Sequence, residues 1–590
     1  MRRFSSVFVV VVHTLVVVTL MTIGAGSALA GGNEFPGGGT RNLGRGGSGF
    51  TRADDPTVML RNPALLADLW EDMAYAGVHI LVPKACFQAT GNYGWGSQGT
   101  DVANFGDGPV LLNPPNARAP DGTPLPNVRD EAFPKVCYQG PLPILPNVAL
   151  SMKLADNLGV GLGFFPPDNA ALPQWGNRDG TVDTPGGLRP SPTRWFRSHL
   201  NISYFSALGA VGYRPFSWLR IGFGFQWALV VYNTTEFTRF TATRNTANDV
   251  RVDVFGRDLF VPGLVGSVQV TPTDGLDIAV GFKWSDRVKS RAKLDITTGY
   301  FGTGEPFEYI DSSGTPTTAA GLLPTRSNNR VGTVDSPPIW VPQLSFGIRY
   351  ADRLVPRPKN EQWQAAHQAA GRSVQDSMAT ERWDIELNAI VYFNSVNNMS
   401  RFVTPNERVD TQSVAPDGTL GVPLSAFIGQ CSGGGSDCSE RAVPVYLHGK
   451  TQYSLRLGGE YNILPGVFAV RAGLSYETDG QSPEHLNVTN YQLGRAGLHV
   501  GATLRIADKT DISIAYAHVI NKDVSLTVNP ARPFNTDNPD KYHVVQGKGD
   551  GVARFAIPDA VDASEGPLFA NAGTFYYHLD IASVSLSQHF

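Results

Sequence analysis

Apolar and polar residues alternate with a period of two along many short stretches of this chain. In YSLRLGGEYN, residues 453–462, one set of alternate positions is apolar or aromatic and the other set is mostly polar or charged. Successive side chains of a β-strand point to opposite faces, so this pattern predicts a strand with one apolar face. The pattern returns after ILPG in VFAVRAGLSYE, residues 467–477, and the two stretches are predicted to form a hairpin.

This alternation predicts an all-β protein of about fourteen antiparallel strands. The strands are expected near residues 73–82, 147–154, 158–165, 198–213, 218–233, 263–271, 276–289, 341–350, 382–394, 451–462, 466–477, 496–507, 510–521 and 577–590. Because alternation also occurs in soluble sandwiches, the lengths of the connections must decide between the two architectures.

The connections between the predicted strands are alternately short and long. Short turns are expected at 155–157, 214–217, 272–275, 464–466 and 508–509, and long polar loops at 83–146, 290–340, 395–450 and 522–576. Short turns at one rim and long loops at the other are typical of a bacterial outer-membrane β-barrel, in which an even strand number returns both termini to the periplasm. Residues 351–381 are the exception, since this periplasmic connection is long, and we expect a small helical excursion there.

Composition agrees with a sheet-and-loop protein. The chain has 64 Gly, 42 Pro and 10% aromatic residues, but only 17% charged residues. After residue 30, no apolar run reaches the roughly 18 to 20 residues of a membrane helix. The formal net charge is −4, and no basic field predicts binding to nucleic acid.

Residues 1–30 have the features of a secretory signal peptide. Arg2 and Arg3 precede an apolar run, and Ala28-Leu29-Ala30 places small residues where signal peptidase cleaves. We therefore expect export, with a mature chain that begins at Gly31. An uncleaved membrane anchor is the alternative interpretation.

The last strand supports the barrel prediction independently. In LDIASVSLSQHF, Ala582, Val584, Leu586 and Phe590 share one face, although Gln588 interrupts it. A terminal Phe on an alternating strand resembles the sorting signal that the barrel-assembly machinery recognises in outer-membrane proteins. This machinery is the expected partner in biogenesis, and outer-membrane lipid is the expected partner of the apolar face.

Charged residues within the strands indicate which face is turned inward. An Arg that faces the bilayer midplane costs roughly 2 to 4 kcal/mol, so the charged positions are expected to face the lumen. They are Arg349, Arg456, Arg471, Arg505, Asp384, Glu386 and Glu460. They either brace and hydrate the lumen or contact a ligand directly, and the sequence favours the first role.

The four cysteines fit this topology as two bridges within loops. Cys86 and Cys137 lie in the first long loop, and Cys431 and Cys438 lie together in a later one. Only these two pairings keep each bridge within one loop, and an exported chain can form them. Neither spacing is a CxxC motif, so we expect no metal site, and nothing indicates a cofactor.

Residues 31–72 precede the first strand and are expected to form a hatch inside the lumen, before a barrel of residues 73–590. A barrel of about fourteen strands has room for such a filler, and its glycines permit close packing. Asn62 before Pro63 favours an extended turn, and ALLADLWEDM after it predicts a short helix.

The segment GTRNLGRGGSGFTRADDPTVMLRNPALLADL, with Asn62-Pro63-Ala64, resembles the N-terminal hatch of FadL-type transporters of long-chain fatty acids and aromatic hydrocarbons. VPQLSFGIRYADR, ERWDIELNAIVYFNS and YSLRLGGEYNILPGVFAVRAGLSYETDG resemble paired strands of the same family. The resemblance implies a fourteen-stranded barrel that takes up hydrophobic compounds, with Asn62, Pro63 and Ala64 in the gating hatch.

Family members release their ligand sideways through a kink in the third strand. Here the predicted third strand, LGVGLGFFPPD, carries Gly159, Gly161 and Gly163, and glycine weakens strand pairing. We expect a lateral opening there. The alternative is that these glycines only make room for neighbouring atoms of the hatch.

The sequence leaves two other functional classes open. A general porin or surface adhesin would also have a barrel with large loops, but it has no need of a hatch. An outer-membrane hydrolase would need a nucleophile beside a His, and His499 faces the lumen by parity whereas His518 does not. We expect a monomer that is not an enzyme.

Overall fold

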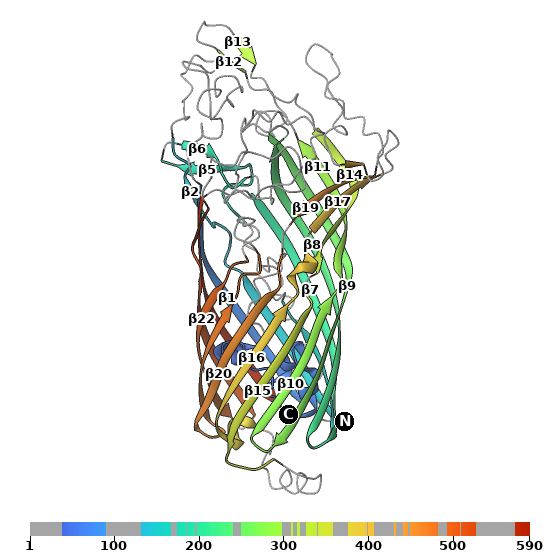
Figure 1. Ribbon diagram of the computed structural model, residues 1–590, viewed down its shortest axis with the longest axis vertical. Coiled ribbons are helices and arrows are strands. Elements are labelled where there is room, and N and C mark those ends of the chain that lie inside the picture. Colours follow the sequence, from blue (N-terminus) through green and yellow to red (C-terminus); the bar gives the residue numbers. More distant parts are fainter. Residues whose placement is uncertain are drawn as a thin grey trace.

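Strands form where the sequence alternates, and they close into a barrel in the computed structural model (Figure 1). The structure describes residues 38–89, 131–166, 174–185, 187–194, 198–239, 249–297, 308–310, 316–318, 326–338, 340–357, 376–397, 399–405, 430–431, 440–446, 449–481, 492–507, 509–526 and 573–590. Residues 1–37, with the predicted signal peptide, lie outside the described residues. Among the described residues, no helix is long and apolar enough to cross a membrane.

The barrel has 14 antiparallel strands, which confirms the predicted fold class. They are β1 (Met73–Ala89), β3 (Ile144–Ala155), β4 (Leu158–Phe164), β7 (His199–Phe216), β8 (Leu219–Arg239), β9 (Asp249–Thr273), β10 (Leu276–Ser285), β15 (Gln343–Arg353), β16 (Glu381–Tyr392), β20 (Gln452–Leu464), β21 (Phe468–Glu477), β22 (Arg495–Ala507), β23 (Thr510–Asn521) and β25 (Gly573–His589).

The first and last strands close the barrel over their whole length. β1 pairs antiparallel with β25 from Met73↔His589 to Ala89↔Gly573, and on its other edge β1 pairs with β3. At the rim with the tight turns, the backbone N–H of Phe590 donates to the carbonyl of Asp72 at 3.0 Å. The chain therefore ends beside the start of its first strand.

Seven further strands in the described part of the chain extend the wall beyond the rim that carries the long connections. They are β2 (Lys135–Cys137), β11 (Arg287–Thr297), β14 (Arg326–Pro338), β17 (Met399–Pro405), β18 (Gln430–Cys431), β19 (Glu440–Tyr446) and β24 (Val524–Leu526). Two small hairpins lie apart from the wall, β5 (Thr181–Thr184) with β6 (Gly187–Pro190), and β12 (Glu308–Ile310) with β13 (Pro316–Thr318). Parts of the predicted loops are thus strands, upper in Figure 1.

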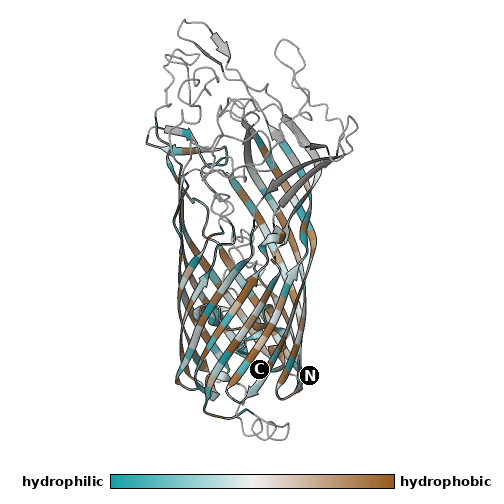
Figure 2. Ribbon diagram, in the orientation of Figure 1, coloured by the Kyte–Doolittle hydropathy of each residue, from teal (hydrophilic) through white to brown (hydrophobic). Residues whose placement is uncertain are grey.

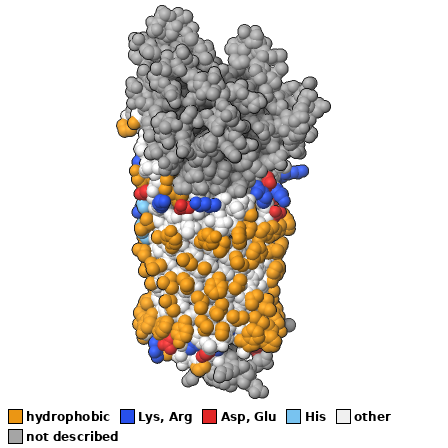
Figure 3. Space-filling model, viewed as in Figure 1, with side chains coloured by type: hydrophobic (Ala, Val, Ile, Leu, Met, Phe, Trp, Pro, Cys, Tyr) orange, Lys and Arg blue, Asp and Glu red, His pale blue; other side chains and the backbone are white. Residues whose placement is uncertain are grey.

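The two faces of the wall differ in polarity as the alternation predicted. Tyr453 and Leu455 are 55% and 52% exposed on the outer face, whereas the next residue, Arg456, is buried on the inner face. Apolar and polar colours alternate along the strands in Figure 2. Figure 3 shows the result as an apolar belt around the barrel, with charged side chains gathered at its edges.

Residues 38–72, which we call the inner segment, pack against the inner face of the wall in the lower half of Figure 1. They contain α2 (Thr40–Gly44) and two short 3-10 turns, η2 (Pro56–Leu60) and η3 (Pro63–Ala67). All residues of these three elements are buried. In the connection between β15 and β16, the structure describes α4 (Ser377–Thr380), while residues 358–375 of the predicted helical excursion lie outside the described part.

Candidate functional site

Two prolines shape the inner segment. Pro56 and Pro63 each stand at the start of a 3-10 turn, where the missing N–H costs nothing. The Asp55 carboxylate accepts from the Thr57 backbone N–H at 2.9 Å and so caps η2. The predicted helix over ALLADLWEDM is wrong, because η3 ends at Ala67 and β1 already begins at Met73.

Glycines on the wall let the backbone of the inner segment lie directly against it. A Cβ added at Gly159 would stand 2.0 Å from the Leu66 carbonyl oxygen. One at Gly222 would stand 2.0 Å from the Ala64 nitrogen. Backbone atoms of the inner segment also approach closely at Gly212, Gly458, Gly473 and Gly501, whereas a Cβ at Gly161, Gly281 or Gly347 would meet side chains of the segment. Any larger residue at the closest of these positions requires the inner segment to move.

Three of these glycines form one row across neighbouring strands. Gly159 of β4 is the register partner of Gly212 of β7, which in turn pairs with Gly222 of β8. The backbone of η3 lies on this row, at Pro63, Ala64 and Leu66. Gly159 and Gly161 of the third strand therefore make room for the inner segment, which is the alternative interpretation considered from the sequence, whereas Gly163 faces the Phe165 ring. Their role in a lateral opening stays a prediction.

Hydrogen bonds fix the Asn62-Pro63-Ala64 motif to β9. The Asn62 side-chain amide donates to the Phe50 carbonyl at 2.7 Å and to Gln269 Oε1 at 3.0 Å. The Ala64 backbone N–H donates to Ser267 Oγ at 3.0 Å. Asn62 thus joins two parts of the inner segment to the wall, rather than bonding the backbone beside it.

Arginines of the inner segment bind carboxylates on the wall. Arg45 and Arg52 both contact Asp384 of β16, at 2.8 and 3.2 Å. Arg349 of β15 binds the same carboxylate at 2.6 Å. Arg41 binds Asp511 of β23 at 2.6 Å. All of these side chains are almost completely buried, so the inner segment is attached to two separated parts of the wall.

Acidic groups of the inner segment complete this network. Burial alone would raise the pKa of Asp54, but the positive charges of Arg52 and Arg41 outweigh it and hold the pKa well below its usual range. Asp54 therefore stays ionised beside Arg52, whose Nε lies 2.6 Å from it. Arg52 also binds Glu460 of β20, and Glu460 binds Arg471 of β21.

The remaining charges predicted for the lumen also lie on its inner face. Glu386 Oε1 accepts from the backbone N–H groups of Phe50 and Thr51, both at 2.8 Å. Arg505 lies 2.7 Å from Asp511 and 2.6 Å from Asp376. Arg456 stands higher, where it contacts Glu477 and the Tyr392 hydroxyl, at 3.3 and 3.0 Å. These charges hold the inner segment or one another.

Sequence reasoning missed several carboxylates of this network. Asp277 and Glu381 bind Arg349, and Asp511 binds Arg41, yet none was singled out. Asp511 shares the parity of Ser513 on β23, so the alternation contained a signal for it. Asp277 and Glu381 stand at strand ends, where parity is hardest to assign.

Above the inner segment the inner face of the wall becomes apolar. On β25 the inward residues change from Ser583, Ser585, Ser587 and His589 to Phe575, Tyr577, Leu579 and Ile581. Thr40 of the inner segment bonds Ser583 at 2.7 Å, so the change begins just above it. The neighbouring strands add Leu81, Ala85, Phe87, Ala515, Ala517 and Val519 to the same buried cluster.

The opposite wall is apolar at its upper end too. A second buried cluster joins inward residues of several strands, among them β7, β8 and β9, to the apolar side chains of η2 and η3. From the wall it includes Leu200, Ile202, Ala228, Val230, Tyr232, Val252, Val254, Val261 and Val265. The interior of a membrane barrel is usually polar. The upper lumen therefore departs from the usual pattern on two sides.

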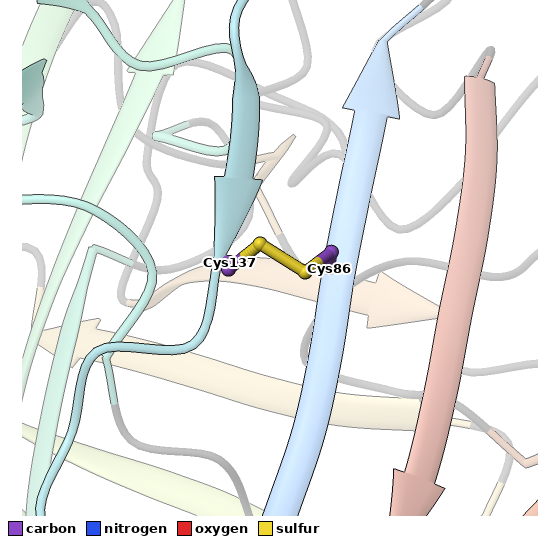
Figure 4. The surroundings of a disulfide bond; sticks show 2 residues. All are labelled: Cys86 and Cys137. Carbon is purple, nitrogen blue, oxygen red and sulfur yellow. A yellow bond between two sulfur atoms is a disulfide. The ribbon is translucent and has the colours of Figure 1, made fainter. Parts of the chain in front are cut away.

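A disulfide lies at the upper end of the first strand. Cys86 of β1 and Cys137 of β2 are direct register partners and are bridged, with a Cα–Cα distance of 3.9 Å (Figure 4). This confirms the first predicted pairing and fastens the start and end of the first long connection to each other. Cys431 lies in β18, but Cys438 lies outside the described residues, so the second pairing is untested.

A serine and a histidine meet on the inner face without forming a hydrolase triad. Ser475 Oγ lies 2.9 Å from His499 Nε2, which places His499 inward as predicted. His518 bonds Asp580 at 2.6 Å on the outer face. Within the described part of the chain, no carboxylate bonds His499, and no group of residues could hold a metal ion.

No family model matches this sequence, and no curated protein sequence matches it. Solved structures do. A FadL homologue from Pseudomonas aeruginosa superimposes with a TM-score of 0.56 at 15% identity, over 95% of this chain and 100% of that one. The toluene transporter TodX of Pseudomonas putida gives 0.51 at 11% identity, over 95% and 100%. Together with the barrel geometry, these similarities show that the chain has the fold of the FadL-type outer-membrane transporters.

Proposed function

We propose that this protein is an outer-membrane channel for the uptake of hydrophobic compounds. The observation that carries the proposal is the apolar inner face above the inner segment, built from residues such as Phe575, Leu579 and Ile581. A lumen that passed only water and ions would not need such a lining. Transfer of an apolar solute from water to this lining is favourable by about 25 cal/mol per Å² of apolar surface buried.

The inner segment is the proposed gate. Its backbone lies against glycines of the wall, and Arg41, Arg45 and Arg52 attach it to wall carboxylates. A solute held in the upper lumen would rest on apolar side chains that the segment contributes to the two clusters, such as Leu43 and Met59. In this proposal, movement around Asn62, Pro63 and Ala64 opens the path.

Release toward the membrane beside β4 is the finer part of the proposal. β4 ends at Phe164, and Pro166 after it has no N–H to continue the ladder. β3 and β7 both continue upward beyond the last partner of β4, at Val148 and Ala207. Leu66 of η3 contacts β4 at Gly159 and Gly161, so a movement of η3 would act directly on this strand.

The proposed ligand class is a long-chain fatty acid or an aromatic hydrocarbon. Its support is the apolar lining of the lumen and the fold shared with a toluene transporter. The barrel closes through β1 and β25 of one chain, which supports a monomer as the working unit. Lipid would surround the apolar belt, and the barrel-assembly machinery would insert the chain.

Transfer of ligand tests this proposal against a general porin. Purified full-length protein is reconstituted in liposomes, and uptake of radiolabelled oleate and toluene is measured beside planar-bilayer conductance. Saturable uptake with little ion current supports a gated hydrophobic channel. A large steady ion current without saturable uptake would show that the barrel is a porin.

The lateral route has its own test at Gly163. A Cβ there would meet the Phe165 ring at 2.4 Å, and its three nearest atoms belong to Phe165 and Val148, whereas one at Gly159 would strike Leu66. We expect Gly163→Ala to slow delivery of ligand into the bilayer while ligand binding stays as in the wild type. Unchanged delivery would exclude an opening at this place.

A further inference from the structure

Basic residues occupy one outward face of β11, just beyond the apolar belt. Arg287, Lys289, Arg291 and Lys293 stand at alternate positions, while Val288, Ser290 and Ala292 between them are buried inside. On the adjacent strand, Arg257 of β9 is the register partner of Arg291. Arg257, Arg291 and Lys293 are exposed. We call these three residues the basic cluster.

The carboxylates on this face are occupied by other partners. Asp286 lies 3.3 Å from Lys289 Nζ, and Asp335 lies 2.6 Å from Arg287. Asp258 accepts from the backbone N–H groups of Phe260 and Lys289. Higher on the wall, Asp253 binds Arg251 at 2.8 Å and stands opposite Asp295. Among the described residues, no ion pair joins a carboxylate to the basic cluster.

The positive charges of Arg257 and Arg291 repel each other when no anion lies between them. Like charges directly opposite each other on neighbouring strands destabilise a sheet. An anion placed between the two guanidinium groups would remove the repulsion and could accept bidentate hydrogen bonds from both. The geometry therefore favours a phosphate-bearing ligand on the outer face of the barrel.

The position of the basic cluster along the barrel axis indicates which molecule carries that phosphate. On β10 the outward residues Val280 and Phe282 are 45% exposed and belong to the apolar belt. The ten residue steps from 276 to 286 rise by about 25 Å at the usual strand tilt, which is the thickness of the apolar band of such barrels. Arg291 and Lys293 follow on β11, beyond this band on the side of the lipid headgroups.

Exposed apolar residues lie directly beneath the basic cluster. A bulge in β9 presents Leu259 and Phe260, which are 56% and 61% exposed. The Trp227 indole donates to the Leu259 carbonyl at 2.9 Å and holds this bulge on β8. Acyl chains can therefore pack on the wall below while a headgroup reaches the cations above.

We propose that Arg257, Arg291 and Lys293 bind the phosphate groups of a phosphorylated glycolipid of the outer leaflet, whose acyl chains lie against Leu259 and Phe260. The inference rests on the proposed function only for the orientation of the barrel in the membrane. The proposal places a specific lipid-binding site on the outer face of β9 and β11.

Native mass spectrometry of the full-length protein with diphosphorylated lipid A tests the site. The variant Arg291→Gln/Lys293→Gln is compared with Arg382→Gln/Lys509→Gln, which removes two exposed cations at the opposite rim. Each cation near an anionic lipid surface strengthens binding by about fivefold, so we expect roughly thirtyfold weaker lipid A binding in the first variant. The second variant should bind like the wild type.

Two further binding measurements distinguish a lipid phosphate from free inorganic phosphate as the ligand. Dephosphorylated lipid A should bind the wild type weakly, and millimolar inorganic phosphate should not displace lipid A. Equal lipid A binding by both variants would overturn the proposal, and displacement by free phosphate would make the cluster a simple anion site. Toluene binding by the Arg291→Gln/Lys293→Gln variant shows that the barrel is folded, and it reports separately on the proposed transport function.

Discussion

Glycine is the residue type that brings the inner segment into direct contact with the wall. At Gly212 a Cβ would stand 2.5 Å from the Pro63 carbonyl oxygen, and at Gly222 it would stand 2.0 Å from the Ala64 nitrogen. Backbone atoms at such positions cannot move aside as a flexible side chain would. The alternation of the strands identifies these glycines as inward, but only the three-dimensional contacts reveal what they accommodate.

The variant Gly212→Val should displace η3 from the wall. We expect faster hydrogen exchange in residues 63–67 and a higher ion conductance, because the inner segment no longer seals against β7. The matched control is Gly209→Val on the same strand, where an added Cβ meets no atom within 4 Å. Equal exchange and conductance in the two variants would contradict the role of Gly212.

Asn62 is the second residue on which the position of the inner segment depends. The change Asn62→Ala removes both bonds of the side-chain amide and leaves the Phe50 carbonyl without this donor. We expect local destabilisation of the inner segment by about 1 to 3 kcal/mol, measured from hydrogen exchange of residues 50–64. The barrel should still assemble, and the exposed control Asn201→Ala should leave exchange unchanged.

The strands themselves are the part of the fold that the sequence predicts best. Their number and order are confirmed, because a wall between lipid and a polar lumen imposes a strict period of two. Their upper ends were predicted too short. On β11 the outward residues are Arg and Lys while Val288 and Ala292 face inward, so the phase of the pattern is inverted above the membrane.

The inner segment lies against the inner face of the wall, but its role as a hatch stays a prediction and its details differ from those expected. Its position before the first strand and its glycines indicated a filler of the lumen. The helix expected after Pro63 is instead a single 3-10 turn, because η3 lies against the glycine row and Asp68 binds Arg220 at 2.7 Å just after its end. Such tertiary contacts override local helix propensity.

Asp384 joins two arginines of the inner segment to β15 and β16. The change Asp384→Asn leaves Arg45, Arg52 and Arg349 partly unpaired in a buried site. Breaking a buried pair typically costs 3 to 5 kcal/mol, so we expect proteases to cleave residues 38–72 more readily. The control Asp352→Asn affects an exposed pair with Arg382 and should change stability by less than about 1 kcal/mol.

In the molecule as a whole, the lumen changes along the barrel axis from charged and polar to apolar. The lower lumen holds the inner segment by ion pairs and glycine contacts, and the upper lumen is lined by two apolar clusters. The inward charges of the lower half could be predicted from the sequence, because charged side chains within strands must avoid lipid. The upper half was missed, although the adjacent apolar residues Ile581 and Ala582 mark the point where the inward face of β25 becomes apolar.

The central claim is that the apolar upper lumen binds hydrophobic ligand. Its most direct test is equilibrium binding of toluene and of oleate to full-length protein in nanodiscs, comparing Leu579→Asn with Ser587→Asn. Both positions face inward on β25, but only Leu579 belongs to the apolar cluster. We predict that Leu579→Asn weakens binding about tenfold or more, because burying an amide without a partner costs about 1 to 3 kcal/mol, while Ser587→Asn binds like the wild type. Equal affinity in both variants, or no binding to the wild type, would contradict the account.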